Sequence, residues 1–258
     1  MALIFRNRPG LVAYVTCGDP DISTTKDVVL AAAQAGADVI ELGVPFSDPV
    51  ADGPVIQAAS QRALDGGTQL NDVLRLAREV REQSDVGLIV FSYLNPIVRF
   101  GLARFCAAAA DAGVDGALVT DLPIEEAGEY IEQMRARSLA TVFLAAPTSP
   151  DERLKRIAEM SSGFVYAVSR TGVTGARNDI SEDARELVGR IRRYTKLPVA
   201  VGFGVSTAEQ FATVGDFADA VVVGSAIVKT VESAGKERAA DAVADFVRGL
   251  RGATAGAK

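Results

Sequence analysis

The chain has 258 residues, of which 48% are apolar and 23% are charged, and its formal net charge is −6. This length is ordinary for one α/β barrel and the composition supports a large core, so we expect a single domain over residues 1–258. The acidic balance and the lack of a basic cluster argue against a nucleic-acid surface.

Targeting and membrane signals are weak. No apolar run approaches the roughly 18 residues that a membrane-spanning helix needs. The apolar stretch before Arg6 is too short for the core of a signal peptide. Cys17 and Cys106 form no spacing motif, and two isolated thiols suit a reducing compartment. We therefore expect a cytoplasmic protein without membrane association.

The chain contains no histidine. This excludes Ser-His and Cys-His nucleophile systems, imidazole bases and histidine-ligated metal sites. A Schiff-base aldolase is also disfavoured, because no lysine lies inside a predicted strand and that mechanism needs a desolvated lysine. The remaining candidates for chemistry are carboxylates, tyrosines, arginines, backbone dipoles or a cofactor, and we expect no metal site.

Short, continuously apolar runs recur along the chain, as is typical of parallel strands that are covered on both faces. Helical segments separate them, for example 71–83, whose apolar residues share one face. The predicted strands are Leu11–Thr16, Val39–Val44, Gly87–Ser92, Gly116–Thr120, Thr141–Ala145, Phe164–Val168, Val199–Gly202 and Ala220–Val223.

Eight strand–helix units predict a closed (β/α)8 TIM barrel. An open doubly wound sheet is the alternative, but it expects a glycine-rich turn after the first strand, where this chain has Cys17-Gly18-Asp19-Pro20. Three helix-to-strand joints share a glycine, at Gly36, Gly113 and Gly215, which we expect to be left-handed.

Two connections are long, the one after Glu41 and the one after Ser169. Side chains alternate along a strand, so Val39, Glu41 and Gly43 should face the barrel interior. Burial should raise the pKa of Glu41 and allow it to give and take a proton near neutrality. The alternative is a buried ion pair. Asp52 precedes a glycine and could equally serve a turn.

Glycines follow the last two strands, at Gly202-Phe-Gly204 and Gly224-Ser225. Barrels often bind phosphate there, at a helix N-terminus. The loop 169–175 has two glycines beside hydroxyls and suits a mobile cover or an anion cradle, or is a flexible surface loop. Together these features favour acid–base chemistry by carboxylates on a phosphorylated small molecule.

Five segments in chain order resemble the tryptophan synthase alpha subunit family across nearly the whole sequence. They are ELGVPFSDPVADGP from Glu41, DLP from Asp121, YAVSRTGVTG from Tyr166, GFGV from Gly202 and GSAIV from Gly224. The resemblance implies a (β/α)8 barrel lyase that cleaves indole-3-glycerol phosphate to indole and glyceraldehyde 3-phosphate in tryptophan biosynthesis. It implies no cofactor on this chain, and a beta-subunit partner that carries pyridoxal phosphate in an α2β2 tetramer.

The resemblance also implies roles for particular residues. Glu41 and Asp52 match the catalytic carboxylates. The phosphate site matches Gly175, Gly204, Gly224 and Ser225, and the positions around the indole and its glycerol arm match Tyr14, Leu118, Tyr166 and Phe203. We expect Thr174 to close over Asp52. Positions near the partner match Asp48, Pro49 and Asn95.

One departure from the family concerns the N-terminus, because family members usually begin with a helix before the first strand. About ten residues precede that strand here, so we expect a less covered barrel floor. Other functions stay open at this stage. They are a lyase or isomerase of related sugar phosphates, a regulatory barrel without activity, and an indole-releasing lyase that works without a partner.

Overall fold

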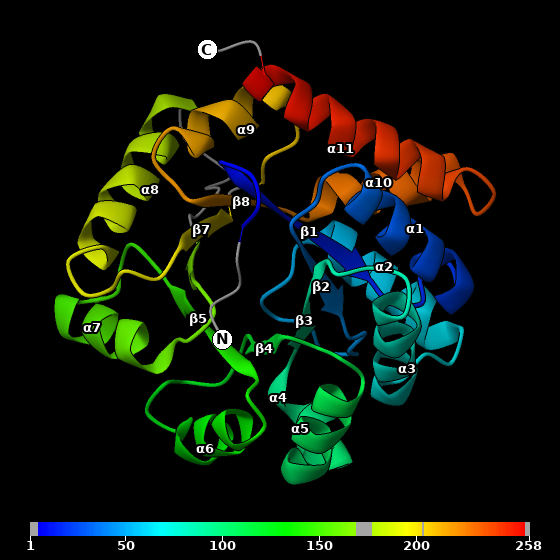
Figure 1. Cartoon of the computed structure of the whole chain (residues 1–258), viewed down its shortest axis with the longest axis horizontal. Helices are drawn as coiled ribbons and strands as arrows, with labels where there is room; N and C mark the ends of the chain where they lie inside the picture. Colours follow the sequence, from blue (N-terminus) through cyan, green and yellow to red (C-terminus); the bar gives the residue numbers. More distant parts are fainter. Residues whose placement is uncertain (1–4, 169–176, 203, 256–258) are drawn as a thin grey trace.

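The computed structural model describes residues 5–168, 177–202 and 204–255 (Figure 1). Eight parallel strands form a closed barrel in chain order, which confirms the predicted fold class. Three strands have the predicted bounds, and each of the others differs from its prediction by one residue. The strands are β1 (Gly10–Thr16), β2 (Val39–Gly43), β3 (Gly87–Ser92), β4 (Gly116–Val119), β5 (Ala140–Ala145), β6 (Val165–Val168), β7 (Val199–Gly202) and β8 (Ala220–Val223).

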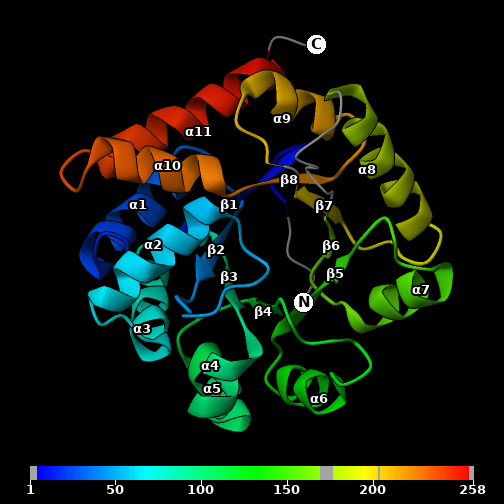
Figure 2. The same ribbon diagram turned by 180° about the vertical axis from the view of Figure 1, so that it is seen from behind.

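Helices surround the barrel (Figures 1 and 2). Two helices, α2 and α3, separate β2 from β3, which accounts for the long connection predicted there. The helices in the described part of the chain are α1 (Ile22–Gln34), α2 (Pro54–Asp65), α3 (Leu70–Arg81), α4 (Leu94–Phe100), α5 (Leu102–Asp111), α6 (Gly128–Ala136), α7 (Asp151–Met160), α8 (Arg177–Ile191), α9 (Ala208–Gly215), α10 (Ser225–Ala234) and α11 (Ala239–Ala255).

The two faces of the strands belong to two separate cores. On β2, Val39 lies in the cluster that fills the barrel interior, whereas Ile40 and Leu42 lie in the cluster between strands and helices. This confirms the predicted alternation, and it directs Glu41 inward. The interior cluster consists of Val12, Val39, Ile89, Leu118, Val142, Phe164, Ala200, Ala220 and Val222.

The floor of the barrel is the end at which the strands begin, and Phe5 is inserted there. Its ring packs against the interior cluster, with its centroid 5.9 Å from that of Phe164. Gly10 makes room for it, because a Cβ at that position would collide with the Phe5 ring. The floor, which we expected to be less covered, therefore contains an aromatic side chain from the leading segment.

The strand pairs β1–β2, β3–β4, β5–β6 and β7–β8 share one kind of hydrogen bond at the barrel floor. A side chain one to three residues before the second strand of the pair accepts from a backbone N–H near the start of the first strand, and the bond ties the two strands together at the floor. The bonds run from Leu11 N–H to Asp38 (2.8 Å), from Leu88 N–H to Asp115 (2.8 Å), from Thr141 N–H to Ser162 (3.0 Å) and from Val199 N–H to Asp219 (3.0 Å).

The glycine joints were predicted correctly at two of three positions. Gly36 has a φ of +112° and Gly113 a φ of +75°, both in the region that favours glycine. The prediction for Gly215 is wrong, because it is the last residue of α9 and its φ is not positive. Its lack of a side chain serves packing instead, since a Cβ there would collide with the ring of Pro9.

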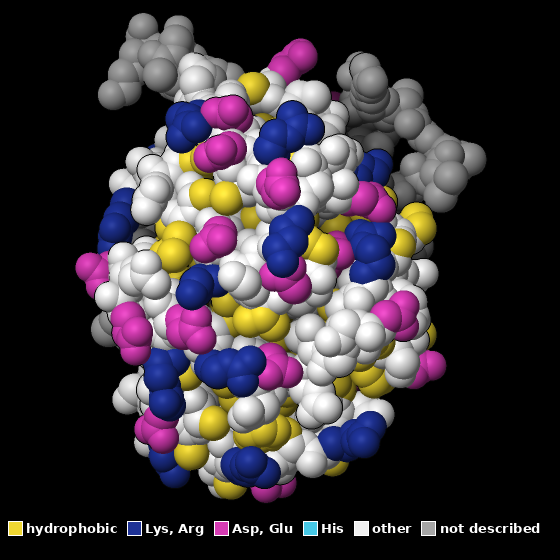
Figure 3. All heavy atoms as spheres, turned by 90° about the vertical axis from the view of Figure 1, so that its right-hand side faces the viewer, with side chains coloured by type: hydrophobic (Ala, Val, Ile, Leu, Met, Phe, Trp, Pro, Cys, Tyr) yellow, Lys and Arg dark blue, Asp and Glu magenta, His cyan; other side chains and the backbone are white. Residues whose placement is uncertain are grey.

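Charges of both signs are interspersed on the face in Figure 3, which is the right-hand side of Figure 1. That face carries no broad basic patch of the kind that nucleic acids bind. Within the described ranges, no helix is long and apolar enough to cross a membrane. The same residues contain no cluster of three or more acidic or cysteine side chains that could hold a metal ion.

Candidate active site

Glu41 lies inside the barrel on β2 and is 1% exposed. Neither of its carboxylate oxygens has a hydrogen-bond partner among the residues that the structure describes, and none of the ion pairs found there includes it. Burial without compensation raises the pKa of Glu41 to about 8. The side chain is therefore mostly a neutral acid at pH 7, which suits a group that first gives a proton and then takes one.

Two tyrosines reach across neighbouring strands beside Glu41. Tyr14 on β1 lies over Gly43 of β2, and Tyr166 on β6 lies over Gly202 of β7. A Cβ at either glycine would collide with the phenol, so the missing side chains make room for the rings. Register places Tyr14 opposite Glu41.

The charges of both carboxylates, Glu41 and Asp52, affect the pKa values of these two phenols. Burial raises the pKa of Tyr14, with a further contribution from the charge of Asp52. Burial raises the pKa of Tyr166 as well, followed by the charges of Glu41 and Asp52. Both rings therefore stay protonated. Because the charges of Glu41 and Asp52 both act on each phenol, the four groups lie near one another in the barrel.

Asp52 lies on the loop that leads from β2 to α2. This loop is on the side of the barrel that faces the viewer in Figure 2 and is turned away in Figure 1. Its backbone N–H donates to the Pro49 carbonyl (3.0 Å), so the residue does take part in a turn. Its carboxylate accepts from the Tyr93 hydroxyl at 3.0 Å. Burial raises the pKa of Asp52, and the Tyr93 hydrogen bond partly opposes that rise. The turn thus involves only the backbone of Asp52, and its carboxylate is available for the chemistry of the site.

The sequence predicted an anion site at the glycines after β7 and β8. Gly204 has a φ of +68°. Gly224 caps the N-terminus of α10, which begins at Ser225 and has no side-chain cap. The first N–H groups of a helix lack internal partners and attract anions. A Cβ at Gly224 would lie 3.5 Å from Cβ of Tyr14, so this helix start adjoins the mouth.

Of the other residues predicted around the substrate, Leu118 is described by the structure. Leu118 is fully buried in the interior cluster, beside Phe91 in the adjoining strand. Thr174, Gly175 and Phe203 lie outside the described residues, as does nearly all of the loop 169–177 that we expected to be mobile.

One of the three predicted partner residues, Asn95, lines a cleft of about 540 Å³ between the Asp52 loop and α4. Asp48 is exposed on the Asp52 loop, and Asn95 is exposed on α4 and lines the cleft. Val50 on the loop is 85% exposed and Val98 on α4 is 60% exposed, and these are the exposed large hydrophobic side chains in the described part of the protein. Two exposed valines do not by themselves mark an interface, because single apolar side chains are common on protein surfaces.

The family model for the tryptophan synthase alpha chain matches residues 2–255. This chain belongs to the tryptophan synthase alpha chain family. A tryptophan synthase alpha chain from Solibacter usitatus is 54% identical over 226 residues, which are 88% of this chain and 85% of that protein. One from Burkholderia thailandensis is 48% identical over 257 residues, which are 99% of this chain and 95% of the relative.

Solved structures agree. A tryptophan synthase complex from Pyrococcus furiosus superposes with a TM-score of 0.87 at 42% identity, covering 95% of this chain and 98% of that one. A ligand-free tryptophan synthase from M. tuberculosis gives a TM-score of 0.85 at 36% identity, covering 95% and 94%. The resemblance predicted from the motifs is confirmed, and with it the family's lyase activity on indole-3-glycerol phosphate in tryptophan biosynthesis.

Two aromatic residues of the site in this alpha chain were not predicted from the sequence. Phe91 meets Tyr14 edge-to-face with ring centroids 5.1 Å apart, and Tyr93 bonds Asp52. A signal for both was available. Alternation from Ile89 directs Phe91 inward, and Tyr93 directly follows a strand at the barrel end where active sites form.

Proposed function

We propose that Glu41 and Asp52 together cleave indole-3-glycerol phosphate in this alpha chain. The observation that supports the proposal is a buried carboxyl without a partner, with a pKa of about 8, at the same mouth as a second carboxylate. Protonated Glu41 delivers its proton to indole C3, which places positive charge on the ring nitrogen. The carboxylate then takes the proton of the adjacent hydroxyl.

As that hydroxyl loses its proton, an aldehyde forms and the carbon–carbon bond breaks. The bonding electrons return to the ring, so indole and glyceraldehyde 3-phosphate leave with no net change in protons. Asp52 lies beside the ring N–H in this scheme and offsets the charge that develops there. The reaction needs acid–base groups and charge stabilisation alone, so we propose no cofactor on this chain.

Binding of the substrate follows from the same arrangement. We assign the phosphate to backbone N–H groups at Gly204, Gly224 and Ser225, supported by the uncapped start of α10. Tyr14, Leu118 and Tyr166 would surround the indole and its glycerol arm. Gly175 at the phosphate, Thr174 over Asp52 and Phe203 at the indole remain proposals from the sequence motif.

The partner is the beta subunit of tryptophan synthase, in keeping with the solved complexes. We propose an α2β2 assembly in the cytoplasm, with pyridoxal phosphate on the beta subunit. Asp48, Pro49 and Asn95 would lie at the contact, supported by the exposure of Asp48 and Asn95.

The test is release of indole from indole-3-glycerol phosphate by the isolated chain, with and without a beta subunit. We expect slow release alone and a higher kcat with the partner, because the Asp52 loop also borders the proposed contact. Turnover of simple sugar phosphates in preference to this substrate would overturn the assignment. Unchanged release after the subunits associate would indicate a free-standing lyase.

Asp52→Asn should lower kcat by about 100-fold with little change in KM, because the amide keeps a hydrogen-bond acceptor and loses the charge. Asp48→Asn in the isolated chain is the matched control, since Asp48 is exposed on the same loop. Indole release by both variants is the measurement. Equal activity of Asp52→Asn and the parent chain would show that Asp52 serves only the turn and has no part in cleavage.

A further inference from the structure

We propose that Tyr93 is a positioning residue that fixes the carboxylate of Asp52 at the barrel mouth. The inference rests on the proposed function, because it concerns how one of the two reacting carboxylates is held. Tyr93 directly follows β3 and precedes α4, and it is 2% exposed. It comes from a different strand from the one that carries Glu41 and the Asp52 loop.

The phenol of Tyr93 makes two hydrogen bonds to that loop. Its oxygen accepts from the backbone N–H of Ala51 at 2.9 Å, and its O–H donates to Oδ2 of Asp52 at 3.0 Å. Both the donor and the acceptor capacity of the hydroxyl are thus used on adjacent residues. One bond fixes the backbone and the other fixes the side chain.

Tyr93 is itself held firmly. The hydroxyl of Ser92 donates to its carbonyl (2.8 Å), and the next backbone N–H, that of Leu94, donates to Asp121 (2.7 Å). The Tyr93 ring packs against Phe46, with centroids 5.1 Å apart and planes inclined at 33°. A buried residue at the end of a barrel strand gives the Asp52 loop a rigid reference point.

The other contacts of Asp52 hold its backbone. Its N–H donates to the Pro49 carbonyl, and its carbonyl accepts from the Gln57 side chain at 2.8 Å. The hydrogen bond that the described residues make to its carboxylate comes from Tyr93. The direction of the carboxylate therefore depends on the phenol, because the loop around it has no regular secondary structure.

The phenol also acts on the charge of Asp52. A donor to the charged form lowers the pKa of a carboxyl, which opposes the upward effect of burial on Asp52. Burial raises the pKa of Tyr93 itself, so it stays a donor. The charge of Asp52 also raises the pKa of two other phenols, Tyr14 on β1 and Tyr166 on β6, and so does the charge of Glu41. The charge of Asp121 contributes to the raised pKa of Tyr93.

Tyr93→Phe tests the inference, since it keeps the ring and removes the hydroxyl. We expect kcat for indole release to fall about tenfold with KM nearly unchanged, as for loss of an interaction made in the transition state. The low-pH limb of kcat should move to higher pH, because Asp52 loses a donor to its charged form. Tyr130→Phe is the matched control, because Tyr130 is also buried and donates to the Ala117 carbonyl (3.1 Å).

A double-mutant cycle separates positioning from general stability. In the Asp52→Asn background, Tyr93→Phe should have little further effect on kcat. An equal loss in both backgrounds would overturn the inference, since Tyr93 would then act through the backbone bond to Ala51 or through folding. Thermal midpoints, compared with that of Tyr130→Phe, report any loss of fold.

A titration keeps the test independent of activity. The Asp52 carboxyl can be followed by ¹³C NMR in the parent chain and in Tyr93→Phe, and its pKa should be higher in the variant. An unchanged pKa would overturn the inference. If the parent chain or Asp52→Asn showed that Asp52 has no part in cleavage, the proposed function would fail, and this titration would still decide whether Tyr93 controls the carboxyl.

Discussion

Glu41→Gln is expected to lower kcat for indole release by about 1,000-fold, because the amide can neither give nor take the proton that both steps require. Binding of a phosphate-bearing analogue should be retained, since the proposed phosphate site is formed by glycines after β7 and β8. In the parent chain, kcat/KM should fall above about pH 8, where Glu41 loses its proton.

The same substitution should stabilise the fold at neutral and higher pH. The pKa of Glu41 is raised from 4.5 to about 8 on folding, so the unfavourable contribution of its charge begins above pH 4.5 and levels off near pH 8. At pH 7 this corresponds to a free energy on the order of 3 kcal/mol. Glutamine has no charge to bury, so the two proteins should have similar stability at pH 4 and diverge as pH rises.

The measurement is the free energy of unfolding by urea at several pH values, together with indole release. Glu132→Gln is a suitable control, because Glu132 is exposed on α6 and should change neither quantity. Activity of Glu41→Gln within a few-fold of the parent would remove Glu41 from the mechanism. A difference in stability that does not grow with pH would show that Glu41 is not buried as a neutral acid.

Much of this barrel was predictable because its strands depend on local patterns. Continuous apolar runs are typical of strands covered on both faces, so each predicted strand agrees with the structure to within one residue at either end. The inward direction of Glu41 followed from the period of two. The family motif supplied Asp52, whose sequence neighbourhood was equally typical of a turn.

Contacts between distant segments were not predictable in the same way. The bond from Tyr93 to Asp52 joins residues from two different βα connections, and no periodicity reports it. The 85% exposure of Val50 depends on how the Asp52 loop folds. Glycine patterns were also ambiguous, since Gly215 resembles Gly36 in sequence but serves packing against Pro9.

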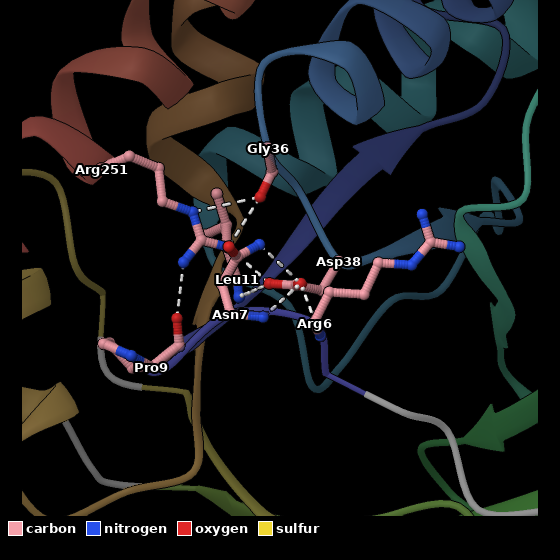
Figure 4. Close-up of polar contacts among 7 residues, drawn as sticks. All are labelled: Arg6, Asn7, Pro9, Leu11, Gly36, Asp38 and Arg251. Carbon is pink, nitrogen blue, oxygen red and sulfur yellow. Dashed lines mark hydrogen bonds and ion pairs between the residues drawn. The ribbon is translucent and has the colours of Figure 1, made fainter.

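The helix-to-strand joint that ends in Asp38 is another example. The sequence predicted the left-handed glycine of this joint but no role for its aspartate. Figure 4 shows Asp38 between the leading segment, β1 and α11. Its carboxylate accepts five hydrogen bonds, so both oxygens are fully used. The donors are the backbone N–H groups of Arg6, Asn7 and Leu11, the Asn7 amide and the Arg251 guanidinium.

Arg251 extends this cluster to the last helix. It donates to the carbonyls of Pro9 (2.6 Å) and Gly36 (2.6 Å) as well as to Asp38, so one side chain of α11 holds the segment before β1 and the joint before β2. The Asp38 side chain is 1% exposed and that of Arg251 is 16% exposed. Removing one charge from so buried a pair leaves the other without compensation.

Asp38→Asn should therefore destabilise the fold by about 3–5 kcal/mol. Its amide would also place a donor where donors already converge. Asp115→Asn is the matched control, because Asp115 accepts from Leu88 N–H as Asp38 does from Leu11, and pairs with Arg81, which also bonds the Gly113 carbonyl. That pair is 26% and 28% exposed, so its loss should cost about 1 kcal/mol.

Unfolding by urea and thermal midpoints would measure both effects, and Asp38→Asn should lower the midpoint by about 10 °C. Below the transition, the kcat of the folded variant should stay within a few-fold of the parent, because the cluster lies at the floor and the reacting groups lie at the mouth. Equal destabilisation by Asp38→Asn and Asp115→Asn would show that burial does not distinguish the two joints. A large fall in kcat with little loss of stability would instead connect the floor to the active site, and would contradict the separation between the two ends of the barrel that the fold implies.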